Sequence, residues 1–421
     1  MVKKLTHPIV IAALACAILV YSGLVCVRPR APFVSLFAHK NIVRLDGMVA
    51  SNPVKAADGT YRADFAVRRA YEKSGASATA RGTVSVRFPA EIVEALYPGK
   101  IYTAASAAVL CETGAYLLLS VSPRFRAGDF SVTHATADGW GSGLAGKIRH
   151  FRARCRLYCR RLLYAWGDAG GLLLALVSGS REYTDSAVAD AFRYAGLSHI
   201  LALSGMHLSL VGGLALAVGR RVAGRRIAET LQLAAIVFFV WFAGLSPSLF
   251  RALVCALIPF VCAKLSLRRP DAVVVLCAAF LLHLMVFPGH LQSAAFMLSY
   301  GALAGILLLG APIRRLLCAR IVPAISDALS ASAAAQVFTA PITLRLFGCL
   351  MPVGIVASVA VAPLVTWFLY AGLCGMVVCL AFPCLAPAVG FLLDLLYDAV
   401  RGLAGFFARF PVLSIIGKEW S

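Results

Sequence analysis

Long apolar runs are the feature that most restricts how this chain can fold. Several of them approach or exceed the roughly 20 residues that a helix needs to cross a bilayer. Of the 421 residues, 60% are hydrophobic and only 14% are charged, and the mean hydropathy is +0.83. Ordinary water-soluble domains do not have this composition. The sequence therefore predicts a polytopic α-helical membrane protein.

The apolar runs divide most of the chain into candidate spans. We expect an N-terminal transmembrane helix within residues 1–30; a cleaved signal peptide is the alternative, but the run is long for one and no clean cleavage site follows. A helical membrane domain is expected over 169–413, followed by a tail at 414–421. A more polar segment, 325–347, is expected to pack inside the bundle and has the length to cross as well. The candidate spans of the domain are 196–219, 227–245, 248–265, 271–287, 291–310, 352–381 and 386–408.

Residues 31–140 have a different pattern and predict a soluble β domain. Apolar and polar residues alternate over 42–49, 61–69 and 82–88, with turn residues between these runs. About five short strands of this kind are compatible with an OB-like barrel. OB folds often bind single-stranded nucleic acid, although a fold alone does not establish a function. Cys111 is the one cysteine in 31–145, so no disulfide can form within that segment.

Residues 141–168 predict a basic amphipathic helix. Apolar residues from Ile148 to Trp166 recur at steps of three and four and share one face. We expect this helix to lie on a membrane surface; a helix that faces nucleic acid is the alternative. The arginines along one flank of the apolar face are Arg149, Arg152, Arg156 and Arg160.

The formal net charge of +21 first suggests an orientation in the membrane. Basic clusters at 220–226, 264–269 and 314–320 are separated from one another by two predicted spans, so they lie on one side. The positive-inside rule makes that side cytoplasmic and puts the β domain outside. Contact with anionic lipid also fits this charge, and a polyanionic substrate such as nucleic acid is the sharper alternative.

Polar residues at the outer ends of the spans predict the functional region. Imidazole and hydroxyl groups are costly in hydrocarbon, so they usually face a partner, a cavity or a pathway. The head of span 196–219 carries Ser198, His199, Ser204 and His207. Segments 244–252 and 288–293 fall on the same side, and we expect the three to form a polar vestibule. The alternative is that each caps or packs its own helix.

Two further features of the spans call for partners. Arg251 lies about one turn inside its span, where a guanidinium needs an acid, backbone carbonyls, water or a phosphate. A stripe of small residues predicts close approach of another helix. The stripe consists of Gly205, Ser209, Gly213 and Ala217.

The sequence gives little support for metal or hydrolytic chemistry. No set of histidines and cysteines has metal-ligand spacing, so we expect no metal and no cofactor. Ser204 and His207 suggest an intramembrane hydrolase, but the Gly-x-Ser-x-Gly elbow is absent. A serine and a histidine three residues apart on one helix also rarely form a nucleophile and its base.

Residues 196–207 read GLSHILALSGMH and closely resemble the signature of the ComEC-type competence proteins, approximately GLSHLLAISGLH. Residues 244–252 resemble the family's SPSxxRA segment, 292–300 its FQLS helix, 335–341 its AQxxTxP stretch and 362–364 its PL end. The resemblance covers roughly residues 40–410. The chain departs from the family pattern at Ser180, where Asp is usual, and at Ser358, where Asn is frequent.

The resemblance implies an inner-membrane channel, rather than an enzyme, that passes single-stranded transforming DNA into the cytoplasm. The metallo-β-lactamase-like domain of many members has no counterpart in this sequence, so we expect no nuclease activity. Implied partners are single-stranded DNA, membrane lipids, a DNA receptor, a separate nuclease, a cytoplasmic ATPase and further copies of the chain. A small-solute transporter of the inner membrane is the alternative function. The implied channel residues are Ser198, His199, Ser204, Gly205, His207, Ser248, Arg251, Ser299 and Gln336.

Overall fold

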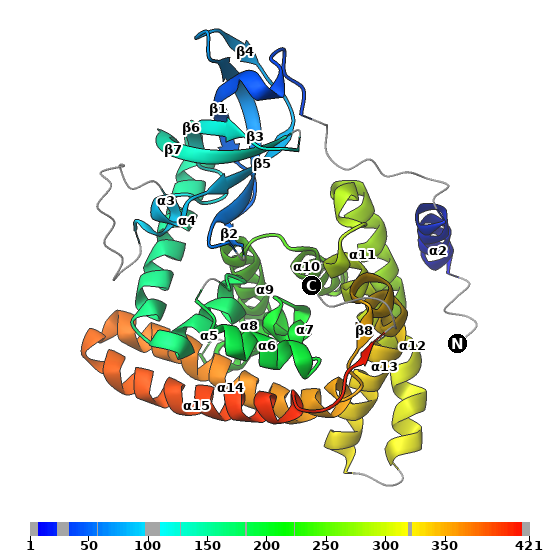
Figure 1. The fold of residues 1–421 in the computed structure, drawn as a ribbon. Helices are drawn as coiled ribbons and strands as arrows, with labels where there is room; N and C mark the ends of the chain where they lie inside the picture. Colours follow the sequence, from blue (N-terminus) through cyan, green and yellow to red (C-terminus); the bar gives the residue numbers. More distant parts are fainter. Residues whose placement is uncertain are drawn as a thin grey trace. The chain divides into compact units, whose positions relative to one another are not determined.

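The computed structural model describes residues 7–22, 33–56, 58–96, 110–126, 128–181, 183–222, 224–318 and 322–414. The chain divides into two compact units, which are described separately below (Figure 1). The barrel unit comprises Arg28–Gly167 and Ser180–Tyr183. The helical unit comprises Met1–Val27, Asp168–Gly179 and Thr184–Ser421.

The barrel unit is built on a closed sheet. Strand β1 (Ile42–Val49) pairs with both β3 (Tyr61–Glu72) and β6 (Tyr116–Pro123). Strand β5 (Thr83–Phe88) pairs antiparallel with β3 and parallel with β7 (Asp129–Gly139), and β7 pairs with β6. The ring β1-β3-β5-β7-β6 therefore returns to β1, as an OB-like barrel requires. The smaller elements are β2 (Val54–Lys55), β4 (Ser77–Thr79), η1 (His39–Asn41) and α3 (Ala90–Glu94).

Alternation along the strands fills the barrel interior. Every second residue of β3 from Tyr61 to Val67 is buried, and β5 alternates in the same way. The register of β1 shifts between Asp46 and Gly47. A Cβ on Gly47 would lie 2.2 Å from the carbonyl oxygen of Ala66. Only glycine therefore fits at this bulge, which bends β1 around the barrel.

Helix α4 (Gly143–Tyr164) belongs to the barrel unit. Half-buried Leu157 and Tyr164 pack against the barrel core. The ring of Tyr164 also stacks on that of Tyr183, with centroids 3.5 Å apart. This helix is followed at once by α5 (Gly167–Ser178), the apolar helix with which the chain passes into the helical unit.

The helical unit contains α2 (Pro8–Tyr21) and the helices that follow α4. Ala13 of α2 joins a buried cluster with Phe280 and Phe296, so α2 packs against α11 and α12. The remaining elements are α6 (Ser186–Tyr194), α7 (Ser198–Leu201), α8 (Gly205–Val222), α9 (Gly224–Ala243), α10 (Pro247–Lys264), α11 (Ala272–Val286), η2 (Pro288–His290), α12 (Ala294–Cys318), α13 (Pro323–Phe347), β8 (Cys349–Leu350), α14 (Gly354–Ala381), η3 (Pro383–Leu385), α15 (Ala386–Phe407) and β9 (Leu413–Ser414).

Among the residues that the structure describes, four helical stretches are long and apolar enough to cross a membrane: Pro247–Lys264, Ala294–Leu317, Gly354–Ala381 and Pro383–Phe407. The apolar stretches Pro8–Tyr21, Gly167–Ser178, Ile227–Ala243 and Ala272–Val286 are shorter. The expectation of one helix over 196–219 is wrong, because Ala202–Ser204 are not helical and separate α7 from α8. The α-helical membrane class and the small β domain are both confirmed.

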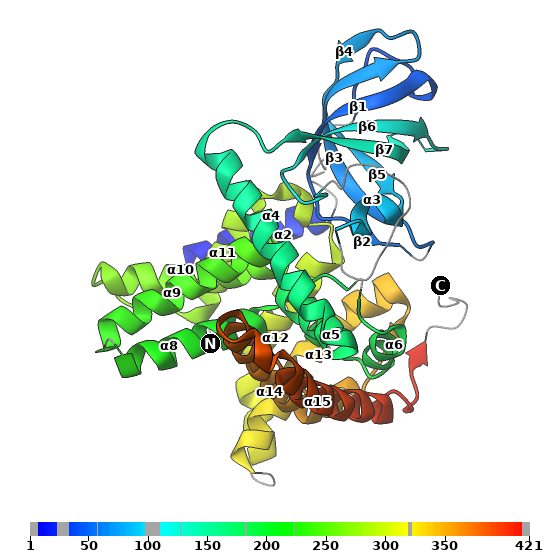
Figure 2. The same cartoon turned by 90° about the vertical axis from the view of Figure 1, so that its left-hand side faces the viewer.

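Consecutive helices pack as antiparallel pairs. Helices α8 and α9, α12 and α13, and α14 and α15 lie side by side (Figures 1 and 2). A Cβ on Gly305 would lie 2.3 Å from the carbonyl oxygen of Ala334, so glycine permits the close approach of α12 and α13. Basic residues gather at the turns between α8 and α9, between α10 and α11, and at the end of α12. Arg320 of the third predicted cluster lies outside the described residues.

Candidate functional site

The motif of residues 196–207 folds around the start of α8. Ser204 precedes α8, and its backbone N–H donates to His207 Nδ1 over 3.2 Å. The Ser204 hydroxyl oxygen also lies 3.2 Å from the same nitrogen. This is one half of a capping box, with an imidazole in place of the usual Glu or Gln at the third helical position. The spacing Ser-x-x-His thus starts a new helix, which explains why the predicted continuous helix is interrupted.

His207 is a buried imidazole with one nitrogen left over. Its exposed fraction is 0%. Because Nδ1 accepts the Ser204 N–H, the proton of the neutral ring is on Nε2, and Nε2 has no hydrogen-bond partner among the described residues. An unpaired donor of this kind costs about 1–3 kcal/mol. Ser198 and His199, by contrast, are exposed on α7.

The Ser204–His207 contact does not form a hydrolytic dyad of the usual kind. The structure brings the two side chains together, which the spacing on one helix did not predict. However, Nδ1 already accepts a backbone N–H, and no described carboxylate bonds to the ring. Among the described residues no group of three His, Cys, Asp or Glu side chains is placed to hold a metal ion.

Three predicted site residues from different helices, Gly205, Arg251 and Ser299, meet at the Arg251 guanidinium. Its guanidinium, on α10, donates to the carbonyl oxygen of Ser299 on α12. Another guanidinium nitrogen lies 3.2 Å from the position of a Cβ on Gly205, the first residue of α8. A side chain at position 205 would therefore push Arg251 away. The convergence of α8, α10 and α12 at one cation supports the expectation that these motifs form one region.

No acid that the structure describes neutralises Arg251. Among the acids of the helical unit, Glu229 pairs with Arg225 and Asp327 with Arg314. Asp271 accepts the backbone N–H of Val273 as the N-cap of α11. None of the described acidic residues forms an ion pair with Arg251, so its positive charge is met by a carbonyl dipole.

Several polar residues of the predicted vestibule cap their own helices. The Ser246 hydroxyl accepts the Leu249 N–H over 3.3 Å, and Pro247 follows it, a typical helix start. The Ser293 hydroxyl likewise accepts the Phe296 N–H at the start of α12. The alternative of local capping is thus correct for these two residues. Ser248 lies half-buried in the first turn of α10.

A histidine pair missed by the sequence analysis lies between α11 and α12. The Tyr300 hydroxyl donates to the Ala279 carbonyl over 3.1 Å, so its oxygen can accept from His283 Nδ1 at 3.2 Å. His283 Nε2 then accepts from His290 Nδ1 at 3.1 Å. Every link of this chain is satisfied in the neutral state. The two histidines are seven residues apart on either side of a turn, and this spacing alone gives no signal of contact.

Gln336 holds the turn that precedes α14. Its side-chain amide donates to the Met351 carbonyl over 2.9 Å. The same turn packs against Gly196, where a Cβ would lie 3.1 Å from the Cα of Gly354. The motif at 196–207 and the motif at 335–341 therefore meet at this turn, and Gln336 positions the turn.

The predicted packing stripe on α8 is wrong for contacts within this chain, except at Gly205. Ser209 and Ala217 are exposed, and a Cβ on Gly213 would meet nothing within 4 Å. The close approach to α9 is made instead at Gly212 and Gly219, where a Cβ on Gly219 would lie 2.8 Å from the Cα of Ala228. A four-residue step drifts by about 40° around a helix, so the stripe leaves the contact face.

The arginines of α4 are also placed differently from the prediction. Arg156 and Arg160 are 2% and 4% exposed. They pair with Glu112 of the barrel at 3.1 and 2.8 Å. The prediction that these two arginines lie at a membrane surface is therefore wrong, because the barrel covers them. Arg149 also faces the barrel, since its guanidinium lies over the Tyr116 ring at 5.9 Å. Arg152 is half-buried.

Charge stabilises the buried carboxylate in this cluster. Burial alone raises the pKa of Glu112, but the guanidinium charges of Arg156, Arg160 and Arg152 outweigh burial and hold that pKa below its usual range. Burial raises the pKa of the nearby Cys159 thiol to about 11. The carboxylate is therefore ionised and the thiol neutral at pH 7.

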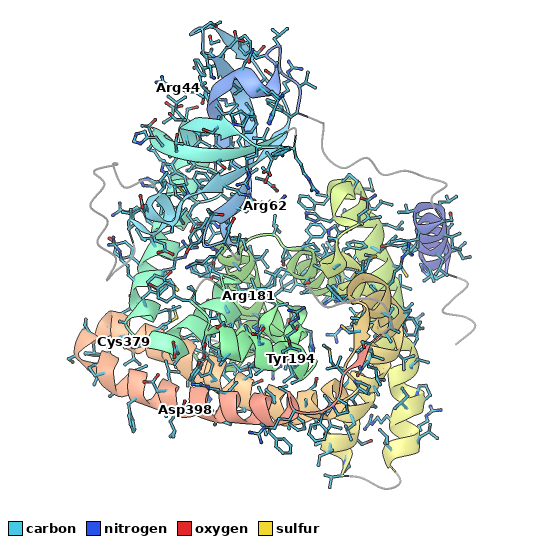
Figure 3. The ribbon with its side chains drawn as sticks, in the orientation of Figure 1. Arg44, Arg62, Arg181, Tyr194, Cys379 and Asp398 are labelled. Carbon is cyan, nitrogen blue, oxygen red and sulfur yellow. The ribbon has the colours of Figure 1, made fainter. Side chains whose placement is uncertain are left out.

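The outer surface of the barrel is basic. Two of its exposed arginines are Arg44 on β1 and Arg62 on β3 (Figure 3). The turn between β6 and β7 presents Phe125 fully to solvent, with Arg124 and Arg126 on either side of it. His39 steadies this turn through the Arg124 carbonyl, at 3.1 Å. The triplet Arg-Phe-Arg in a turn is a sequence signal that the motif analysis missed.

Comparison with known proteins adds a family to this geometry. A family model described as "Competence protein" matches residues 176–421, more than half of the chain. ComE operon protein 3 of Bacillus subtilis (strain 168) is 31% identical over 134 residues. That alignment covers 32% of this chain and 17% of the relative, so the chain matches only a minor part of the relative's length. No solved structure matches the chain.

Proposed function

We propose, from the premise that this chain belongs to the competence protein family, that it forms a membrane channel for single-stranded DNA. Family membership gives the coarser role, in the uptake of DNA during competence. The channel, the single strand and the direction into the cytoplasm are our inference. The activity of the whole relative is not assumed, because the alignment covers 17% of it.

The observation that carries the proposal is the guanidinium of Arg251. It is half-buried, it bonds to the Ser299 carbonyl, and no described acid neutralises it. The N-terminus of α8, at Gly205, adds a partial positive charge beside it. A phosphodiester brings one negative charge per nucleotide, which such a cation can meet. A single cation also lets each phosphate leave again, whereas a dense basic lining would hold the strand.

The barrel supplies features for an initial contact with the strand. Its exposed arginines suit phosphates, and the exposed ring of Phe125 suits a stacked base. The positive-inside rule, applied to the basic turns of the helical unit, supports an inner-membrane orientation with this barrel outside. The proposed path runs past Ser204 and His207, whose Nε2–H donates to none of the described residues.

The test is import of labelled, nuclease-protected DNA into the cytoplasm of the source organism. We expect deletion of the gene to abolish import. Arg251→Gln is expected to lower it about tenfold or more, since a charge-assisted hydrogen bond contributes about 1.5–3 kcal/mol. Arg251→Lys keeps the charge and should retain part of the activity. Arg225→Gln, which changes an exposed arginine of the α8–α9 turn, is the matched control and should leave import unchanged.

The outcomes separate the proposed roles. Unchanged import after deletion in a demonstrably competent strain would contradict the channel. If deletion abolishes DNA import but the Arg251→Gln variant imports DNA fully, the protein is still the channel and Arg251 does not contribute to its path. Saturable flux of a small anion that needs Arg251 but not DNA would favour the solute transporter, because an unneutralised cation also fits a small anion.

A further inference from the structure

Helix α4 has an exposed apolar stripe. Its large side chains remain open to solvent: Leu144 is 74% exposed, Ile148 44%, Phe151 61% and Tyr158 58%. Half-buried Cys155 and Leu162 continue the same row. Steps of three and four residues put all six on one face of the helix. Contiguous apolar surface of this kind marks an interaction site.

The barrel fixes the direction in which this stripe points. Arg156 and Arg160 lie on the opposite flank and are buried in ion pairs with Glu112. Ala153 and Leu163 are buried on the same inner side. Rotating α4 about its axis would break these contacts, so the stripe is held facing away from the barrel.

A row of cations borders the stripe on its other edge. Lys147, Arg154 and Arg161 follow one another at seven-residue steps and are all exposed. Seven residues are close to two helical turns, so the three share one edge. Arg161 also donates to the Leu96 carbonyl at 3.2 Å, which leaves Lys147 and Arg154 as the cations directed to a partner. The helix contains no Asp or Glu.

These features indicate that the apolar stripe of α4 contacts a lipid surface. An apolar stripe edged by Lys and Arg is the composition of helices that lie in the membrane interface. So many basic residues prevent α4 from crossing the bilayer. At 22 residues it is about 33 Å long, and its C-terminal end at Tyr164 is followed at once by the apolar helix α5. The chain therefore leads from α4 directly into its membrane-embedded part.

We infer that α4 lies in the interface of an anionic bilayer, with its apolar stripe among the acyl chains and Lys147 and Arg154 at the headgroup phosphates. Arg156 and Arg160, which the sequence pattern put at the lipid, instead anchor α4 to the barrel. In this arrangement α4 tethers the barrel to the membrane surface by one defined face. This inference does not depend on DNA passing through the helical unit.

The experiment uses the full-length protein in vesicles of phosphatidylethanolamine and phosphatidylglycerol. A benzophenone amino acid replaces Phe151 or Tyr158, both exposed, so the fold should tolerate it. The control position is Ser74, exposed in the turn between β3 and β4. After irradiation, mass spectrometry is expected to detect lipid adducts at 151 and 158 and none at 74.

Charge reversal tests the cationic edge. Lys147→Glu with Arg154→Glu should lower the lipid adducts at 151 several-fold in anionic vesicles. Lys40→Glu with Lys73→Glu, at exposed positions off the helix, should not. Equal labelling at 74 and 151 would overturn the inference. Protein–protein adducts at 151 in place of lipid adducts would also overturn it and identify a second copy as the occupant.

Discussion

The two units each bury arginine, but they treat its charge in opposite ways. In the barrel unit Arg156 and Arg160 both contact the carboxylate of Glu112, at 3.1 and 2.8 Å. In the helical unit Arg251 meets the carbonyl of Ser299, and no described carboxylate pairs with it. The same kind of side chain therefore has a carboxylate counterion in one unit and, among the described residues, none in the other.

The presence or absence of a counterion distinguishes an arginine that stabilises the fold from one that can bind a ligand. A buried ion pair satisfies its own charges, and removing one partner leaves the other exposed to a large desolvation cost. A guanidinium without a counterion keeps its attraction for an anion from outside. The comparison thus assigns Arg156 to the attachment of α4 and Arg251 to the proposed path.

Removing the acid of the barrel cluster should have the largest effect. Glu112→Gln leaves two buried guanidinium groups unneutralised, and we expect the free energy of unfolding of the barrel unit to fall by about 3–5 kcal/mol. Thermal unfolding of the detergent-solubilised protein measures this change. Glu229→Gln is the control, because its partly exposed pair with Arg225 contributes about 0.3–0.5 kcal/mol. Equal effects of the two substitutions would break the comparison.

The same substitution at both arginines sharpens the contrast. Arg156→Met removes one partner of Glu112, and a loss of about 2–3 kcal/mol is expected. Arg251→Met removes an unneutralised charge together with one hydrogen bond to a carbonyl, so stability should change by about 1 kcal/mol or less. Thermal unfolding of both variants provides the measurement. A larger loss at Arg251 than at Arg156 would mean that Arg251 is chiefly structural.

Acid should produce the smallest effect, a loss of stability of the barrel unit. The pKa of Glu112 is lower in the folded protein than its ordinary value of 4.5. Its stabilising contribution is therefore complete above that value and is lost as the pH falls through the lowered one. Unfolding curves from pH 7 to pH 3 should show this dependence in the native chain and a weaker one in Glu112→Gln.

Local sequence patterns predicted most of the fold. Apolar length predicted the membrane class, alternation predicted the β domain, and the basic turns follow from the same spans. The family motifs also led to a real convergence, since Gly205, Arg251 and Ser299 meet around one guanidinium. The prediction of a packing stripe on α8 was wrong, because the residues on a helix face do not specify what packs against them. The prediction of a continuous helix over 196–219 was wrong, because an apolar run does not specify where a cap interrupts it.

By itself the sequence determined the class of the protein, its two kinds of domain and the residues near which the site lies. Each of these depends on the composition and period of residues close together in the chain. Only the tertiary structure decided that Arg156 faces Glu112, that Arg251 pairs with no described acid, and that His283 bonds to His290. The burial of a charge or a polar group depends on partners brought from distant segments, and no local period records them.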